Sequence, residues 1–398
     1  MRQCVAVLGG GIRGTAIAAL LAQSQACEVI LLERDRIGSG TTSTNHGRLH
    51  SGASLWQGGL DSLIHRHRTG SELIRQLPGV LEKQEQGVYF VPEDTPFFET
   101  ELERLHIHHR RLRSWKFIDS FMRGDHFNPA RLAGKFAAYA ESLGAAISTN
   151  SAIYSIEAQT GQQFCICLAN GRKIKAHVIV NALGSWSNQI HSELPLPRLN
   201  LEWNQWRILC LLPEIPSGTP LNRVIAIADK NTLPTAVPHK PWITFSCRKT
   251  PEKVSVPIEM SGGKWRRFDK NDEFDTVLFE TSAQYFLPLQ SLSAQQRLFS
   301  FSGVYPSFEM CRERPYRLLH SEQVPNYYIV YGENATTALL DATETAEVIL
   351  QQLDPSRSWI GGTYLAEKLS TRFTHKVYPD TAEMIWENRV DHAASIFR

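Results

Sequence analysis

The fold is decided by residues 4–33, which read CVAVLGGGIRGTAIAALLAQSQACEVILLE. A short apolar run ends in glycines, an Ala/Leu-rich helical stretch follows over residues 14–23, and a second apolar run covers residues 28–33. Strand, glycine turn, helix and strand form a βαβ unit, in which the two strands lie parallel in one sheet. The sequence therefore predicts an α/β protein built on a parallel sheet.

The turn after the first predicted strand satisfies the GxGxxG pattern at Gly9, Gly11 and Gly14. The first glycine of this pattern makes the tight turn, the second lets the backbone approach a pyrophosphate, and the third lets the helix pack on the sheet. Glu33 follows Gly14 by 33 − 14 = 19 residues, which is the spacing of a carboxylate that accepts the ribose hydroxyls. We therefore predict a dinucleotide site at the helix N-terminus.

Beyond the βαβ unit, the chain continues with a long loop and further helices. Residues 34–59 are rich in Gly, Ser and Thr with little periodicity, and loops of this length are often functional. Residues 60–77 and 97–116 have polar helical patterns, and residues 129–143 predict a clearer helix with Pro129 near its start.

The second half of the chain predicts strands, followed by a return to the α/β pattern. Residues 152–157, 163–169 and 173–181 predict a meander of strands, and the proline-containing stretch 195–290 predicts a mostly antiparallel second domain. Residues 327–352 again read as strand, glycine turn and helix. The first domain is therefore predicted to be discontinuous.

A second strand that ends in a glycine turn lies at residues 178–186, which read VIVNALGSW. Enzymes that use NAD usually hold it in one self-contained half of the fold. A cofactor held between two distant segments is better explained as FAD in an extended conformation.

The predicted fold class is α/β, with a Rossmann-like FAD-binding domain on a parallel sheet and an α+β substrate domain with a mostly antiparallel sheet. The predicted FAD-binding domain comprises residues 1–80, 126–190 and 301–353. The predicted substrate domain comprises residues 81–125 and 191–300, and a C-terminal extension covers residues 354–398.

Composition excludes several classes of protein. With 398 residues, 42% hydrophobic and 21% charged, the chain can bury a large core. The net charge of 42 − 40 = +2 argues against nucleic-acid binding by bulk charge. No apolar run approaches the roughly 18 residues of a membrane-spanning helix, and the first strand begins at Cys4, which leaves no room for a leader.

The cysteines indicate a reducing compartment. The chain has seven cysteines and no CxxC motif. Cys165 and Cys167 alternate within a predicted strand and so share one face. A reduced, cytoplasmic protein is therefore predicted.

Residues 40–53, GTTSTNHGRLHSGA, resemble the flavin-contacting loop of FAD-dependent oxidoreductases of the D-amino-acid-oxidase (DAO) superfamily. The best match is the branch of glycerol-3-phosphate dehydrogenases and L-2-hydroxyglutarate oxidases, with its Asn-[His/Ser]-Gly-x-x-His-[Ser/Thr]-Gly pattern. The NALGSW run resembles the second FAD segment of the family, and residues 332–337, GENATT, resemble its last segment. Three motifs in the order of the family are more specific than any one of them.

The resemblance implies a flavin domain built from both ends of the chain and a sheet-based substrate domain over the flavin. It implies non-covalent FAD, with a covalent link at His46 as the alternative. The implied cofactor-binding residues are Gly9, Gly11, Ile12, Arg13, Gly14, Glu33, Arg34, Thr41, Thr42, Asn45, His46, Gly47, Ile153, Ala182, Gly184, Trp186, Gly303, Asn334, Ala335, Thr336 and Thr337.

The resemblance also implies that His50 is the general base for an alcohol substrate. Hydride leaves carbon for flavin N5, so the hydroxyl proton needs an acceptor, and an imidazole with a pKa near neutrality suits this task. The alternative is that His50 only packs or hydrogen-bonds near the flavin.

The sequence departs from the family at the expected substrate-binding arginine. The family often has Gly-Val-Arg-Pro, whereas residues 303–306 read GVYP, so Tyr305 stands in that position. On an extended segment Arg48 and His50 share a face, and Arg48 is the candidate replacement that binds the substrate anion. Arg48 equally suits a contact with the FAD phosphates or with a surface acid. Asn334 replaces the usual lysine of the last FAD segment.

We therefore predict an FAD-dependent enzyme that oxidises a CH–OH group of a small anionic substrate. One alternative is an amine oxidase of the glycine or sarcosine type, and another is a binding or assembly protein that holds FAD structurally. The predicted partners are a small-molecule substrate and an electron acceptor, which is oxygen, a quinone or a partner protein, without nucleic acid and without a transmembrane segment.

The basic, histidine-containing segment 106–113 is not expected to bind a metal. The spacing of His106, His108 and His109 lacks the usual carboxylate or cysteine partners of a metal site. Together with residues 110–113 they read as a solvated basic helix. An alternative role for the same segment is peripheral contact with an anionic membrane.

Overall fold

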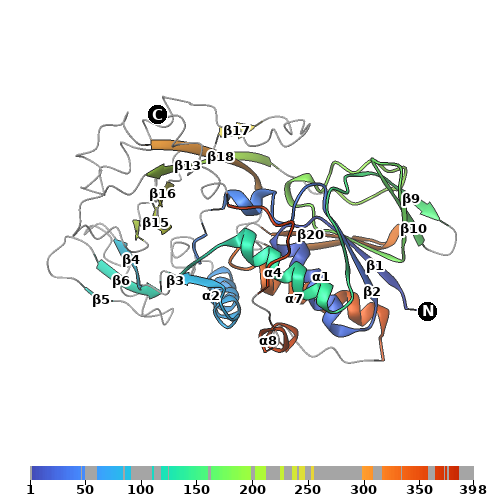
Figure 1. The fold of residues 1–398 in the computed structure, drawn as a ribbon, viewed down its shortest axis with the longest axis horizontal. Helices are drawn as coiled ribbons and strands as arrows, with labels where there is room; N and C mark the ends of the chain where they lie inside the picture. Colours follow the sequence, from blue (N-terminus) through green and yellow to red (C-terminus); the bar gives the residue numbers. More distant parts are fainter. Residues whose placement is uncertain are drawn as a thin grey trace.

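A computed structural model gives the fold (Figure 1). The structure describes residues 2–45, 47–49, 61–83, 86–90, 110–111, 118–123, 125–159, 163–198, 202–211, 225–227, 235–239, 242–246, 252–254, 298–307, 316–332, 334–356, 364–371, 373 and 376–384. His46 and His50 therefore lie outside the described residues, as do His106, His108 and His109.

A six-stranded sheet forms the centre of the first part of the fold. In spatial order its strands are β19 (Tyr316–Ser321), β20 (Val324–Gly332), β12 (Val178–Asn181), β1 (Cys4–Leu8), β2 (Glu28–Leu32) and β8 (Ala146–Ser148). All neighbours pair in parallel except β19 and β20, which are antiparallel. The predicted α/β class and the parallel sheet assembled from both ends of the chain are confirmed.

Helices cover one face of this sheet. They are α1 (Ile12–Ser24), α4 (Pro129–Ser142) and α7 (Ala338–Leu353), with α2 (Asp61–Arg75) against α7, and α8 (Tyr364–Ser370) against α1 and α7. Local chemistry sets the limits of α4. Asn128 Oδ1 accepts a hydrogen bond from Arg131 N (2.8 Å), Pro129 occupies the first turn, and Gly144 follows with φ +95°.

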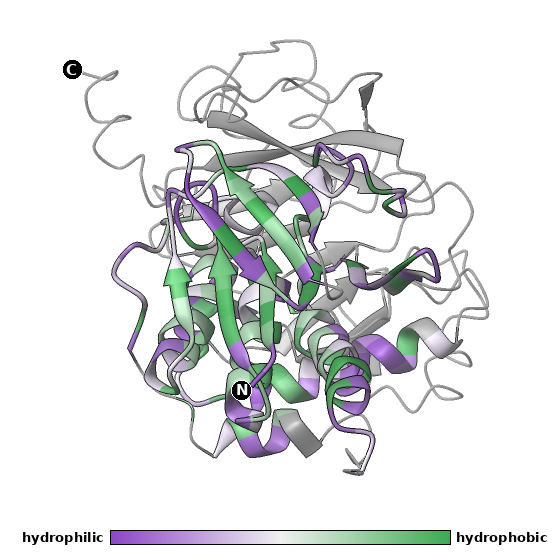
Figure 2. Cartoon of the chain, turned by 90° about the vertical axis from the view of Figure 1, so that its right-hand side faces the viewer, coloured by the Kyte–Doolittle hydropathy of each residue, from purple (hydrophilic) through white to green (hydrophobic). Residues whose placement is uncertain are grey.

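A three-stranded antiparallel sheet covers the other face. Its order is β11 (Lys173–Ala176), β10 (Gln163–Leu168) and β9 (Ile153–Gln159). Alternate residues of β1 divide between the two layers, because Val5 and Val7 pack with the helices whereas Ala6 and Leu8 pack with this sheet. Figure 2 shows the hydrophobic residues concentrated in the strands between the layers.

The prediction of one strand over 173–181 was wrong. The stretch forms two strands in different sheets, β11 and β12. His177 lies between them, with its N–H donating to Cys4 O (2.8 Å) and its Nδ1 accepting from Cys4 N (3.0 Å). These bonds to β1 direct the chain into the parallel sheet, so a tertiary contact divides an apolar run that looks continuous in sequence.

The second part of the fold contains a nine-stranded sheet. Along its path run β17 (Glu252–Val254), β13 (Glu202–Leu211), β16 (Trp242–Ser246), β15 (Thr235–His239), β14 (Ile225–Ile227), β4 (Gln86–Phe90), β6 (Ile118–Arg123) and β5 (Arg110–Arg111), and β18 (Leu298–Ser307) pairs with β13. Within this sheet, β14 and β4 are the only described strands that pair in parallel. The predicted, mostly antiparallel sheet is confirmed. β18 pairs with β13 along its whole length, although the predicted domain boundary at residue 301 divides it.

The helix predicted over 97–116 was wrong at residues 110–111, and the other residues of that stretch lie outside the described part of the chain. Arg110 and Arg111 form β5, where they lie opposite Asp119 and Ile118 of β6. Sheet pairing, with opposite charges across the two strands, overrides the local helical pattern.

The chain returns to the first part of the fold near its C-terminus. Ile37 N donates to Asp380 O (3.0 Å), and Ala382 N donates to Ile37 O (2.7 Å). Phe373 packs edge-on against Phe136 of α4, with the ring centres 5.3 Å apart. A two-stranded sheet of β3 (Leu81–Lys83) and β7 (His126–Phe127) completes the described elements. Within the described residues, every helix is too short or too polar to cross a bilayer.

Candidate cofactor site

A groove lies at the carboxyl ends of β1, β2, β12 and β20. β1 lies in the middle of the sheet, with β2 on one side and β12 on the other, so the groove occupies a topological switch point of the kind that binds ligands in open α/β sheets. Its empty space, open mouth included, is roughly 1370 Å³. Its lining runs from the glycine turn after β1, past the end of β2, to the turns after β12 and β20.

Four segments far apart in the sequence line this groove: residues 9–45, 151–153, 182–190 and 330–335. They supply Gly9, Gly11, Ile12, Arg13, Leu32, Glu33, Arg34, Ser39, Gly40, Thr41, Thr42, Asn45, Ser151, Ile153, Ala182, Leu183, Gly184, Ser185, Trp186, Gln189, Ile190, Val330, Tyr331, Gly332 and Ala335. The three predicted nucleotide-binding segments therefore meet in one place.

The three glycines of the fingerprint have different surroundings. Gly9 has φ +103°, and a Cβ at this position would lie 2.7 Å from Ala182 O. A Cβ at Gly14 would lie 2.0 Å from Gly9 O, so this glycine permits the close packing of α1 on the turn. Gly11 has ordinary extended backbone and faces the groove, where a Cβ would lie 3.3 Å from Thr42 Oγ1.

The N-terminus of α1 provides an anion site at the groove. Gly11 caps the helix without a side-chain hydrogen bond, and the first turn has no acidic residue. The first turn of α1 therefore has no carboxylate of its own against the positive end of the helix dipole, which suits a diphosphate. Thr42 Oγ1 accepts from Ile12 N (3.1 Å) and joins the loop after β2 to this turn.

Glu33 lies at the end of β2, on the groove wall. Its Oε2 accepts from Gly10 N (2.5 Å) and its Oε1 from Asp35 N (2.8 Å). Burial raises the pKa of Glu33, while the hydrogen bonds from Asp35 and Gly10 oppose the rise. Each carboxylate oxygen has a second lone pair, so the fixed side chain can still accept hydrogen bonds from a ribose diol.

The turn after β12 is held by a buried amide. Asn181 Nδ2 donates to Ser187 O (2.8 Å) and to Tyr327 Oη (2.9 Å), and its Oδ1 accepts from Leu183 N (3.2 Å). This turn presents Trp186 to the groove, with the Arg34 guanidinium 5.8 Å from the ring centre. The pair forms a flat, positively charged wall that suits an aromatic ring or a phosphate.

The last segment is tied to the glycine turn by a buried ion-pair network. Arg13 Nε lies 2.7 Å from Asp341 Oδ2, and Arg13 Nη2 donates to Asn334 O (2.5 Å). Asp341 is fully buried, and its Oδ1 also accepts from Arg66 Nη2 (2.8 Å). The network joins α1, α2 and α7 directly beside the groove. Sequence reasoning missed Asp341 and Arg66, and a lone acid in the apolar stretch 338–342 was the available signal.

The loop that leads to His50 is fixed up to Leu49. Gly47 has φ +72°, and its N–H donates to Asn45 Oδ1 (2.8 Å). Leu49 N donates to Asp125 O (3.0 Å), and Asp125 in turn pairs with Arg75. Arg48 is 2% exposed and lies outside the groove lining, and burial lowers its pKa to about 9. Its burial does not fit the surface-acid alternative.

The strand that carries Gly303 and Tyr305 approaches the same region. β18 lies against η1 (Thr41–Thr44) and η3 (Gly184–Trp186), two turns of the groove wall. Tyr305 pairs with Asn204 of β13, and its side chain lies outside the described part of the structure.

The structure therefore brings together most of the predicted cofactor residues. Those that line the groove are Gly9, Gly11, Ile12, Arg13, Glu33, Arg34, Thr41, Thr42, Asn45, Ile153, Ala182, Gly184, Trp186 and Ala335. Those described but outside the lining are Gly14, Gly47, Asn334, Thr336 and Thr337. Gly303 lies on β18, where the structure describes only the path of the strand. Thr336 and Thr337 are fully buried at the start of α7. Sequence reasoning missed Ser151, Gln189 and Ile190, which have no motif of their own.

A mostly parallel sheet with this glycine turn and this groove at its carboxyl edge defines a dinucleotide-binding fold. The model of the FAD dependent oxidoreductase (DAO) family matches residues 4–348. The chain belongs to this family and is an FAD-dependent oxidoreductase. The residues present fit the cofactor, because the groove joins a glycine-lined helix N-terminus to a fixed carboxylate.

Known relatives act on different donors. The anaerobic glycerol-3-phosphate dehydrogenase subunit A1 of Haloferax volcanii is 26% identical over 340 residues, covering 77% of this chain and 54% of that protein. The chain thus spans about half the length of this curated relative. The structure is similar to glycine oxidase from Geobacillus kaustophilus (TM-score 0.65, 18% identity, 94% and 100% of the two chains) and to the FAD complex of glycerol-3-phosphate dehydrogenase from Bacillus halodurans (TM-score 0.65, 16% identity, 99% and 72%).

Substitutions at two glycines of the GxGxxG pattern should distinguish an effect on stability from an effect on FAD binding. We expect Gly14→Ala to lower the free energy of unfolding by about 1–3 kcal/mol, because its Cβ meets a backbone oxygen that cannot move aside. Gly11→Ala serves as the matched variant, since its Cβ would point into the groove and should mainly weaken FAD binding. Urea unfolding of the FAD-free chains and FAD titration measure the two effects. Equal loss of stability in both variants would contradict this division.

Proposed function

We propose that the protein oxidises a CH–OH group of a small anionic substrate, of the 2-hydroxy acid or polyol phosphate type. The observation that carries this proposal is the contact of β18 with η1 and η3. It supports a substrate site where the strand of Tyr305, the loop that continues to His50, and the cofactor groove meet. The similarity to a glycerol-3-phosphate dehydrogenase subunit supports an alcohol donor, whereas the structural likeness to glycine oxidase shows the fold alone.

The segments that line the groove would hold the cofactor. The helix N-terminus at Gly11 and Ile12 would bind the diphosphate, and Glu33 would accept the ribose hydroxyls. Arg34 and Trp186 would border the nucleotide, and Ala335 the last segment. Bound FAD accepts a hydride at its N5 atom. The family resemblance supports non-covalent attachment of FAD. Release of intact FAD by heat or acid would distinguish this from a covalent link at His46.

His50 would accept the hydroxyl proton at one of its ring nitrogens as the hydride leaves carbon. Asn45, Gly47 and Leu49 fix the segment that leads to it through hydrogen bonds with the backbone and with Asp125. Such anchoring supports a positioned base, because proton transfer requires hydrogen-bond distance between base and substrate.

Arg48 would bind the anionic group of the substrate. Its guanidinium is desolvated, and a contact with a carboxylate or phosphate is stronger there than at the surface. Tyr305 would contribute a phenolic hydroxyl to the same substrate region in place of the arginine common in the family.

An anaerobic assay of flavin reduction tests the proposed function. The holoenzyme should bleach with a 2-hydroxy acid or a polyol phosphate and should stay oxidised with amino acids. Bleaching by amino acids or secondary amines alone would instead identify an amine oxidase. A flavin that stays yellow with every donor of both classes would identify a protein that holds FAD without catalysis.

Replacement of Arg48 by leucine should raise KM by about 30- to 150-fold with little change in kcat. This factor corresponds to the loss of a charge-assisted contact of about 2–3 kcal/mol. Steady-state kinetics and FAD titration measure KM and cofactor affinity, and Arg48→Lys serves as the matched variant with conserved charge. Loss of FAD with an unchanged KM would assign Arg48 to the cofactor phosphates instead.

The reaction requires an electron acceptor, which we propose to be oxygen, a quinone or a partner protein. We also propose a cytoplasmic location, on the basis of the sparse cysteines without a CxxC motif. Cys4, Cys27, Cys165 and Cys167, the cysteines whose side chains the structure describes, are free thiols. Stopped-flow reoxidation with oxygen and with a soluble quinone distinguishes the first two acceptors.

A further inference from the structure

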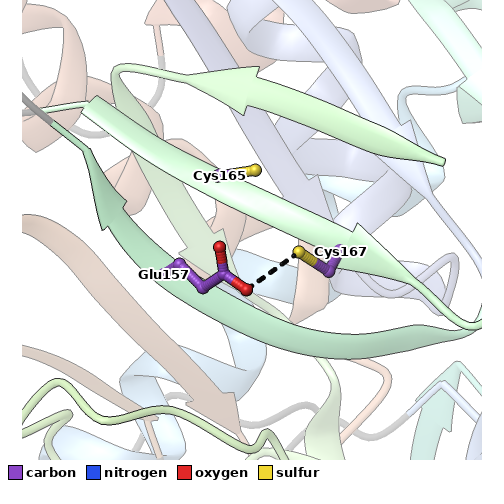
Figure 3. Close-up of side chains that lie close together, drawn as sticks. All are labelled: Glu157, Cys165 and Cys167. Carbon is purple, nitrogen blue, oxygen red and sulfur yellow. Dashed lines mark hydrogen bonds between the residues drawn. The ribbon is translucent and has the colours of Figure 1, made fainter. Parts of the chain in front are cut away.

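A cluster of metal-ligating side chains lies outside the groove, on the sheet of β9, β10 and β11 (Figure 3). Cys165 and Cys167 are two residues apart on β10, so they share one face, and Glu157 lies directly across on β9. Their two Sγ atoms and a carboxylate oxygen all lie within 4.8 Å of one another. Within the described part of the chain, no other three His, Cys, Asp or Glu side chains are grouped in this way.

We propose that Glu157, Cys165 and Cys167 bind one thiophilic divalent cation of the zinc class. Zinc–sulfur bonds of about 2.3 Å and zinc–oxygen bonds of about 2.1 Å place tetrahedral ligand atoms about 3.6–3.8 Å apart. The thiol of Cys167 donates to Glu157 Oε1 at 3.4 Å, close to that spacing. Small rotations of the side chains would complete the three-ligand set, and water would supply the fourth ligand.

The strands present these ligands on a rigid support. The opposite face of β9 and β10 carries Ile156 and Ile166, which are fully buried in the core against the parallel sheet. Both cysteines are buried, whereas Glu157 is half exposed at the side chain. An ion could therefore reach the site from the carboxylate side without opening the core.

The surrounding charges balance a bound dication. Two thiolates and one carboxylate carry three negative charges in total. Their complex with a divalent ion therefore has a net charge of −1. Lys173 Nζ lies 4.0 Å from Glu157 Oε2, and Lys175 pairs with Cys165 across β10 and β11. Both lysines are exposed and can turn away from the ion or toward the carboxylate as the charge changes.

Ion binding is favoured over the other reactions open to two neighbouring thiols. Two residues along a strand place the Cα atoms about 6.6–6.8 Å apart, at the far limit of about 6.8 Å for a disulfide. A metal ion binds the deprotonated thiolates and displaces the thiol protons, so its affinity should rise with pH.

The role of the site would be to join β9 to β10. β9 begins at Ile153, which lines the cofactor groove, while Glu157, Cys165 and Cys167 lie outside the groove lining. The bound ion would therefore stabilise one wall of the groove without taking part in the oxidation.

Cobalt titration of the metal-free holoenzyme, prepared without a histidine tag, tests the proposal. One equivalent of Co²⁺ should produce the d–d bands of tetrahedral coordination, which lie at longer wavelength than flavin absorption. Zinc should abolish these bands by displacement, and the apparent affinity should increase with pH. Absence of tetrahedral bands at saturating Co²⁺ would overturn the proposal.

Single variants identify the ligands. Cys165→Ser, Cys167→Ser and Glu157→Gln should each weaken cobalt binding by about tenfold or more, because even an outer partner of a metal ligand is worth about 10- to 100-fold. Cys27→Ala is the matched control, since Cys27 is a buried thiol outside the cluster, and it should bind cobalt normally. Unchanged binding in all three cluster variants would overturn the proposal.

Thiol protection in the unmodified protein tests the site without relying on a variant that folds. Saturating zinc should slow the alkylation of Cys165 and Cys167 in the holoenzyme and leave that of Cys4 unchanged, as measured by peptide mass spectrometry. Equal alkylation of Cys165 and Cys167 with and without zinc would overturn the proposal.

Discussion

Replacement of His50 by asparagine should slow anaerobic flavin reduction by the substrate about 10²–10⁴-fold, equivalent to about 3–5 kcal/mol of barrier. Alcohol protons have pKa values near that of water, so hydride loss without a base would pass through a protonated carbonyl. Asparagine retains size and some hydrogen bonding but cannot take the proton. The flavin spectrum of the variant should therefore remain nearly intact, and stopped-flow absorbance measures the rate.

The pH dependence of the same rate provides a second readout. The base must be neutral to accept a proton, so wild-type reduction should fall as pH decreases through a value of about 6–8, and the His50→Asn variant should lack this limb. His65→Asn is the matched control, because His65 is an exposed histidine on α2. If His50→Asn reduces its flavin at the wild-type rate across this range, the base lies elsewhere and an amine donor becomes the better explanation.

Replacement of Asp341 by alanine should lower the free energy of unfolding by about 3–5 kcal/mol, the usual result of removing one partner from a buried ion pair. The carboxylate is fully buried between Arg13 and Arg66, and it also accepts from Thr337 Oγ1 (3.0 Å). Its loss leaves two guanidinium groups close together without their shared anion. Urea unfolding of the FAD-free protein, followed by tryptophan fluorescence, measures the change.

The neighbouring acid Glu344 offers a control on the same helix. Its side chain is 34% exposed and pairs with Arg66 (2.7 Å). Exposed pairs contribute only about 0–1 kcal/mol, so Glu344→Ala should have a small effect. Equal unfolding midpoints for the two variants would show that burial of Asp341 does not control stability.

Much of the nucleotide-binding half can be predicted because its signals are local. A strand, three glycines and an Ala-rich helix lie within residues 4–24, where each residue type is required by the geometry of its own turn. Glu33 follows at a fixed spacing because one helix and one turn separate β1 from β2. The return of strand and helix near residues 327–352 likewise depends on local periodicity, and the structure has β20 and α7 there.

Other features could not be predicted because they depend on residues distant in sequence. Arg13 fits a cofactor contact by motif, yet it also pairs with Asp341 of α7, 328 residues later. The stretch 173–181 divides at His177 because β1 offers hydrogen bonds there, and Arg110–Arg111 forms a strand because β6 lies beside it. In each case a long-range partner outweighs a weak local preference.

By itself, the sequence determined the class of the fold, the glycine turn and the three segments that meet at the groove, because these follow from short-range sterics and periodicity. The tertiary structure alone decided that Arg48 is buried, and that Glu157 joins Cys165 and Cys167 on one sheet face. Burial and cross-strand register are set by how distant segments pack, and the free energy of that packing is absent from any single stretch of the chain.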